Sequence, residues 1–127
     1  MILMASQEDL ELEIISYLTK GEDERIRLLR DQFDHSKVIS HEISGVGSYA
    51  RITVDKQSVK PFETDFNFGD VYIQCDELSD GAAVLVFVRS GYIEALECSA
   101  YGDEWPNEFT NIKLSYMAEP RDFSDIL

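Results

Sequence analysis

The chain has 127 residues, 44% of them hydrophobic, with 25 acidic against 11 basic side chains and a formal net charge of −14. This apolar content excludes an intrinsically disordered chain, and the negative field disfavours nucleic acid and anionic membranes as partners. No apolar run approaches the roughly 20 residues of a membrane span, so we expect one globular domain over residues 1–127, located in the cytoplasm.

A first amphipathic helix is predicted after Ser6, which is followed by Asp9 in a form of the capping box. Its apolar residues recur at helical spacing, and Gly21 suits the position that ends a helix. The predicted apolar stripe is Leu10, Ile14, Ile15 and Leu18. The acids expected on the other faces are Glu8, Glu11 and Glu13.

A second helix is predicted to open with the acidic run 22–24, because acids favour the positive end of a helix dipole. Its apolar stripe consists of Ile26, Leu29 and Phe33. Residues 1–34 therefore form the helical part of the domain.

From residue 35 the pattern changes to short β-like runs separated by turn residues. Ile52 and Val54 alternate with polar residues, as in a half-buried strand. The run Ala82–Val88 is apolar at every position and predicts a central strand covered on both faces. The predicted strands are 38–43, 49–54, 71–75, 82–88, 92–101 and 112–116.

The connections complete this prediction. The pair 90–91 is typical of a tight hairpin, and the spacing that follows it favours a bulge near residues 94–95. Residues 55–69 are predicted as a loop whose phenylalanines pack onto the core, and 119–127 as a loosely held tail. We expect an α+β domain, with two N-terminal helices packed on a largely antiparallel sheet of five to six strands over residues 35–118.

The acidic residues are unevenly distributed. Residues 1–34 hold nine acids against four bases, and residues 35–60 hold two acids against four bases. Residues 61–127 hold fourteen acids against three bases. A negative field concentrated in this way attracts a basic partner.

His35 and His41, the only histidines, are the first candidates for catalysis or metal binding. No cysteine or acid near them has the spacing of a zinc-ligand set, so we expect no metal, no cofactor and no catalytic residue. A small hydrolase or metal-dependent enzyme that uses these histidines with carboxylates is the alternative.

Two further features have structural interpretations. Gly45 and Gly47 indicate a hairpin turn that needs positive φ, since the third glycine and following helix of a phosphate loop are missing. Cys75 and Cys98 lack the spacing of a redox or zinc pair. Buried free thiols are favoured over a disulfide between them, and this question stays open.

The segment 101–109 places Trp105, the only tryptophan, in a predicted loop among acidic residues. An aromatic anchor within a charged rim is typical of a protein-binding hot spot, although Trp105 can also fold back to cap the core. The predicted partner-binding residues are Asp103, Glu104, Trp105 and Glu108, with Asp76, Glu77 and Asp80 as a second acidic cluster.

The segment Phe87–Glu97, followed by Tyr101–Pro106, resembles a pattern in small bacterial proteins, and Gly45–Tyr49 is similar to a turn upstream in the same set. In size, acidity and lack of catalytic motifs the chain also resembles immunity proteins of bacterial toxin systems, including contact-dependent growth inhibition. The pattern covers the last two-thirds of the chain. This resemblance implies a non-enzymatic protein that binds and neutralises a cognate toxin, such as a basic nuclease domain. An interaction domain with another partner, or a dimer joined at a sheet edge, is a further alternative.

Overall fold

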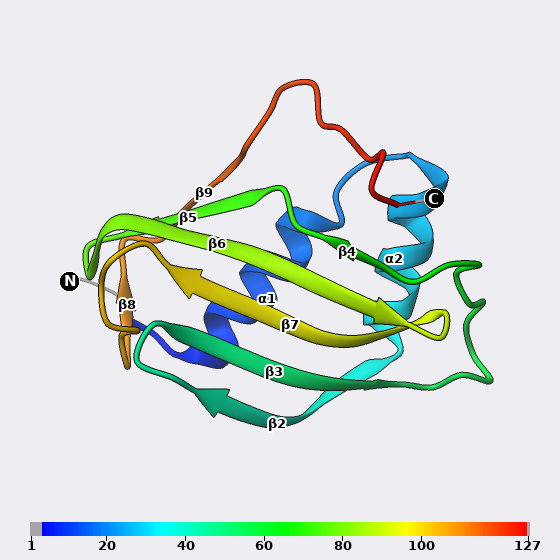
Figure 1. Ribbon diagram of the computed structural model, residues 1–127, viewed down its shortest axis with the longest axis horizontal. Helices are drawn as coiled ribbons and strands as arrows, with labels where there is room; N and C mark the ends of the chain where they lie inside the picture. The colour runs from blue at the N-terminus through cyan, green and yellow to red at the C-terminus, as the bar shows by residue number, and fades with distance from the viewer. Residues whose placement is uncertain (1–3, 127) are drawn as a thin grey trace.

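Two helices lie on one side of an antiparallel sheet in the computed structural model, which describes residues 4–126 (Figure 1). Neither helix is long and apolar enough to cross a lipid bilayer. The elements are β1 (Met4–Ala5), α1 (Gln7–Leu18), α2 (Glu24–Asp34), β2 (Ser36–Ile43), β3 (Gly47–Val54), β4 (Phe66–Phe68), β5 (Val71–Cys75), β6 (Leu78–Arg89), β7 (Tyr92–Ala100), β8 (Phe109–Thr110) and β9 (Lys113–Tyr116).

The main sheet has seven strands, with the order β2-β3-β7-β6-β5-β9 and with β4 paired to β6 outside this path. A separate two-stranded sheet joins β1 to β8. The predicted α+β architecture is confirmed, with seven strands in place of five to six. The additional strand is β4, which lies in the predicted loop 55–69 and pairs with residues 86–88 of β6. Three residues are too short to show strand alternation in a sequence, and β6 supplies the pairing.

The capping box predicted for α1 is present. The Ser6 hydroxyl accepts a hydrogen bond from the N–H of Asp9, whose carboxylate accepts one from the N–H of Ser6, both at 3.1 Å. The predicted stripe faces the core, where a fully buried leucine or isoleucine contributes about 2 kcal/mol. The helix ends at Leu18 with Thr19 as its C-cap, so Gly21 lies one residue beyond its predicted position.

Helix α2 begins at Glu24, directly after its N-cap Asp23, and buries the predicted stripe together with one polar residue, Gln32. The Gln32 amide donates to the carbonyl oxygens of Lys60 at 2.9 Å and Gly91 at 3.0 Å. Its oxygen accepts a hydrogen bond from the N–H of Ile93 at 3.0 Å. This side chain therefore ties the helix to the loop before β4 and to the hairpin between β6 and β7.

That hairpin follows the sequence prediction. Ser90 and Gly91 have positive φ values of 54° and 89°, as a tight turn between antiparallel strands requires. The pairing shifts register between Phe87, opposite Ala95, and Val88, opposite Ile93. Glu94 is thus the extra residue of the predicted bulge.

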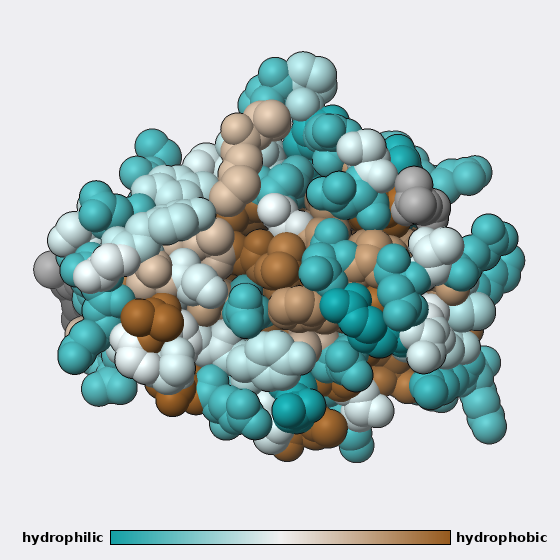
Figure 2. All heavy atoms as spheres, in the orientation of Figure 1, coloured by the Kyte–Doolittle hydropathy of each residue, from teal (hydrophilic) through white to brown (hydrophobic). Residues whose placement is uncertain are grey.

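β6 is central in the sheet, but the prediction that both of its faces are covered is wrong. Val84, Val86 and Val88 are buried, whereas the alternate side chains of Leu85 and Phe87 remain partly exposed. Both helices lie on the opposite side, so no layer formed by residues 4–126 covers this open face (Figure 1). Figure 2 shows hydrophobic side chains at its centre, surrounded by hydrophilic ones.

The prediction of a loosely held tail over 119–127 is also wrong for residues 119–126, which the structure describes. Arg121 binds both carboxylate oxygens of Asp70, at 2.6 and 2.8 Å, and donates to the carbonyl oxygen of Leu18 at 2.8 Å. Ile126 is fully buried in the core. Polar anchors on distant elements hold this segment, and local sequence patterns do not show them.

Candidate functional site

The two predicted acidic clusters lie at one end of the sheet. β6 runs antiparallel to both β5 and β7, so the turn before β6 lies beside the loop after β7, at the left in Figure 1. The N–H of Tyr101 donates to the carbonyl oxygen of Gly81 at 3.0 Å, and the N–H of Ser79 donates to Asp103 at 2.6 Å. We call these six carboxylates the acidic end: Asp76, Glu77, Asp80, Asp103, Glu104 and Glu108.

Three carboxylates of the acidic end are fixed by hydrogen bonds. Besides Asp103, Glu77 accepts from the N–H of Thr110 at 2.7 Å and from its hydroxyl, and Asp76 accepts from the Asn111 amide at 2.7 Å. Burial acts to raise the pKa of Glu77, but the hydrogen bonds from Thr110 outweigh it and hold that pKa below its ordinary value. Glu77 is therefore a fixed negative charge at neutral pH.

The other three carboxylates, on Asp80, Glu104 and Glu108, are exposed. Within residues 4–126, none of the six carboxylates takes part in an ion pair. A basic residue on a strand that leads to this end is Lys113 of β9, whose partner in the ladder is Gln74 of β5. The acidic end therefore keeps its negative charge for the solvent or a partner.

Trp105 does not serve as an exposed binding anchor, and this part of the prediction is wrong. Its side chain is 7% exposed, its indole N–H donates to the Gln7 side-chain oxygen at 2.8 Å, and its ring centroid lies 5.4 Å from that of Phe109. The alternative interpretation, a cap on the core, is the correct one. Trp105 anchors the loop that carries Glu104 and Glu108.

Sequence reasoning missed a buried polar group on α1. Glu11 is 3% exposed, although it was expected on an outer face. Its oxygens lie 2.9 and 3.0 Å from His41 Nε2, and one accepts from the Gln7 amide at 2.9 Å. A signal was present, because Glu11 precedes Ile14 by three residues and Ile15 by four, which places it on the covered face of the helix.

The structure does not bring the two histidines together. His41 on β2 contacts Glu11, whereas His35 is the C-cap of α2 and its Nδ1 lies 2.9 Å from the carbonyl oxygen of Asp31. Residues 4–126 contain no group of three His, Cys, Asp or Glu side chains placed to hold a metal ion.

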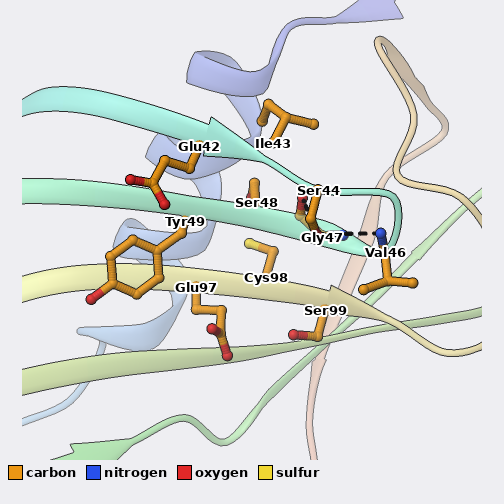
Figure 3. A pocket seen from close by; sticks show the side chains of 10 residues that line it. All are labelled: Glu42, Ile43, Ser44, Val46, Gly47, Ser48, Tyr49, Glu97, Cys98 and Ser99. Atoms are coloured by element: carbon orange, nitrogen blue, oxygen red, sulfur yellow. Dashed lines mark hydrogen bonds between the residues drawn. The ribbon is translucent and has the colours of Figure 1, made fainter.

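A shallow hollow of about 450 Å³ lies near the acidic end, between the ends of β2, β3 and β7 (Figure 3). Tyr49 on β3 lies between Glu42 on β2 and Glu97 on β7, its direct partners in the two ladders. The Arg51 guanidinium lies 3.7 Å from Glu42 and 5.4 Å from the centre of the Tyr49 ring. Cross-strand register creates this arrangement, so the sequence alone did not show it.

Both cysteines are free thiols, as favoured from the sequence. Cys98 is buried, whereas Cys75 is only partly buried, against expectation. Burial raises the pKa of the Cys98 thiol to about 12, which keeps it protonated at neutral pH.

The structure therefore gathers six of the seven predicted partner-binding residues at one end of the sheet and places the seventh, Trp105, in the core. Comparison of the chain with protein-family models, with curated proteins and with solved structures gave no match.

Proposed function

We propose that this protein is an immunity-type binding protein, which neutralises a cognate bacterial toxin by covering a basic surface of that toxin with its acidic end. The observation that supports this proposal is the meeting of two distant acidic segments, which the Asp103–Ser79 hydrogen bond joins. Within residues 4–126, no base forms an ion pair with any carboxylate of the acidic end. In this proposal the protein catalyses no reaction of its own.

A nuclease is the class of toxin that fits this surface best. The active site of a nuclease is positive because it must hold phosphate groups, and an acidic protein surface can occupy that site or a neighbouring patch. The partner of this proposal is thus a basic protein that itself binds nucleic acid.

The geometry of the acidic end suits rapid and specific association. Exposed carboxylates on Asp80, Glu104 and Glu108 steer a basic partner over long distances. Hydrogen bonds already hold Asp103 and Glu77, so less side-chain freedom is lost on binding. The hollow around Tyr49 offers an aromatic contact beside this charged region.

Charge reversal at the acidic end tests the proposal. The purified chain would capture basic proteins from the medium and extract of the producing cells, and the captured protein would be purified and assayed for cleavage of DNA and RNA. We expect the wild-type chain to inhibit that cleavage. The variant Glu104→Lys/Glu108→Lys should associate more slowly, with a weaker dependence of the association rate on salt.

The matched control is Glu63→Lys/Glu94→Lys, which changes the net charge equally at exposed positions near the opposite end of the sheet. This control should retain most of the association rate. Equal slowing by both variants would show that only net charge matters and would contradict the proposed surface. A captured basic protein whose activity is unaffected by the wild-type chain would contradict the neutralising function.

A further inference from the structure

The edge strand β2 exposes an unusual amount of apolar surface. β2 has eight residues, lies at one edge of the main sheet and pairs only with β3. The other side of its backbone therefore has no strand partner within residues 4–126. Val38, Ile39 and Ile43 are 40%, 59% and 57% exposed. Figure 2 shows hydrophobic side chains along the lower edge of the molecule, where β2 runs in Figure 1. A long apolar edge of this kind is a template for pairing with another strand.

A bulge determines which side chains of β2 share a face. Lys37 pairs with Thr53 and Glu42 with Tyr49, and these β3 residues are four apart and so point to the same face of the sheet. Lys37 and Glu42 are five apart, which would place them on opposite faces of a regular strand. The extra residue at the register shift, Ile39, brings both onto the open face.

We propose that β2 pairs antiparallel with β2 of a second copy of this chain, with Lys37 of each copy opposite Glu42 of the other. In this register Val38 faces His41, and both belong to the helix-covered face. Outside the bulge, the two residues of each opposed pair then point to the same face of the sheet, as an antiparallel ladder requires. Two Lys–Glu pairs form across the interface.

The distribution of charge favours a second copy in this orientation. β2 itself holds one base, Lys37, and one acid, Glu42, and so brings no net charge to its own copy, whereas residues 1–34 and 61–127 are acidic. The C-terminal end of β2 lies near the acidic end, because the N–H of Trp105 donates to the carbonyl oxygen of Gly45 in the following turn at 2.9 Å. Antiparallel pairing therefore directs the two acidic ends away from each other and limits their repulsion.

The test is the mass of the chain in solution, measured by sedimentation across a concentration series that reaches the millimolar range. We expect a monomer–dimer equilibrium for the wild type. Lys37→Glu and Glu42→Lys should each weaken dimerisation by about tenfold, because like charges then lie opposite each other twice. An equimolar mixture of the two variants should dimerise as well as the wild type, since each Glu then meets a Lys.

Lys113→Glu is the matched control, because it makes the same charge change on β9, the other edge of the sheet. It should leave dimerisation unchanged. Glu42 also contacts Arg51, so melting curves by circular dichroism would verify that each variant folds, and Lys37→Glu alone leaves that contact intact. A wild-type monomer at all concentrations, equal weakening by Lys37→Glu and Lys113→Glu, or no association in the mixture would each overturn the proposal.

Discussion

The carboxylate of Asp103 accepts a hydrogen bond of 2.6 Å from the backbone N–H of Ser79, 24 residues earlier in the chain. This contact joins the loop after β7 to the start of β6 and so brings two acidic segments together. A negative side chain held by a backbone donor keeps its position in spite of the carboxylates around it. The acidic end is therefore a property of tertiary structure.

Replacement of Asp103 by Ala should loosen this end of the sheet. The N–H of Ser79 would lose its acceptor, and a hydrogen bond to a charged group at an exposed site contributes about 1 kcal/mol. We expect a decrease of that size in the free energy of unfolding, measured by urea denaturation, and faster hydrogen exchange of the Ser79 amide.

Asp103→Asn keeps one acceptor oxygen and should preserve more of the protection at Ser79. Glu104→Ala is the control, since Glu104 is exposed and makes no hydrogen bond within the described residues. Unchanged exchange at Ser79 in Asp103→Ala would show that this hydrogen bond does not hold the two segments together.

Asp23 should make stability depend on pH. Its carboxylate caps α2 and binds Arg25 at 2.8 Å, and Arg25 in turn donates to the carbonyl oxygens of Phe123 at 3.0 Å and Ile126 at 3.1 Å. The side-chain hydrogen bond from Arg25 lowers the pKa of Asp23 from 3.8 to about 2. The stabilisation is therefore complete above the unfolded pKa and is lost as the pH falls through the folded one.

The variant Asp23→Asn can still cap the helix but has no charge. We expect wild type to be more stable than this variant by a constant amount above about pH 5, with the difference shrinking as the pH falls towards 2. Asp23→Ala, which also removes the cap, should lose about 1 kcal/mol more at neutral pH. Urea denaturation at several pH values measures these differences, and a difference independent of pH would contradict the role of the charge.

The two thiols should differ in reactivity. Burial raises the pKa of Cys98 to about 12, and it also raises the pKa of the partly buried Cys75. Because the thiolate is the reactive form, iodoacetamide at pH 8 should modify Cys75 slowly and leave Cys98 unmodified in the folded chain. Mass spectrometry of Cys75→Ser before and after urea unfolding isolates Cys98. Rapid native modification of that variant would contradict the buried position.

Periodicity predicted most of the secondary structure because each pattern is local. The spacing of Leu10, Ile14 and Leu18, the turn at Ser90 and the bulge at Glu94 are readable within a few residues. The short strand β4 was missed because its pairing with β6 is long-range. The apolar run of β6 was assigned to a doubly covered strand, although one of its faces is open to solvent.

From the sequence, the acidic end could be predicted only as two separate clusters of carboxylates, without their proximity in the fold. Their meeting depends on the antiparallel pairing of β6 with β7, which no local pattern in the sequence specifies. Trp105 was misplaced for a related reason, since its indole N–H donates to Gln7, 98 residues earlier in the chain. Glu11 is covered because its carboxylate meets His41 of β2, 30 residues later in the chain. Residue type predicted the chemistry of these side chains, and tertiary contacts decided their exposure.

Gly47 is required for a different reason from the one that the glycine-rich turn 45–47 first indicates. The turn was expected to need positive φ, but neither Gly45 nor Gly47 has it. A Cβ atom on Gly47 would instead lie 2.1 Å from the carbonyl oxygen of Cys98 on the neighbouring strand. Gly47→Ala should therefore push β3 away from β7 and cost about 3 kcal/mol of unfolding free energy.

Gly45→Ala is the matched control within the same turn, because a Cβ there meets nothing within 4 Å. The control should be neutral or should stabilise the fold by about 0.5 kcal/mol, through a less flexible unfolded chain. Urea denaturation of both variants separates crowding from backbone conformation. Equal losses in both variants would mean that the conformation of the turn requires glycine. A loss confined to Gly47→Ala would mean that the close contact between β3 and β7 requires it. The same two strands line the hollow around Tyr49, so that hollow depends on the same contact.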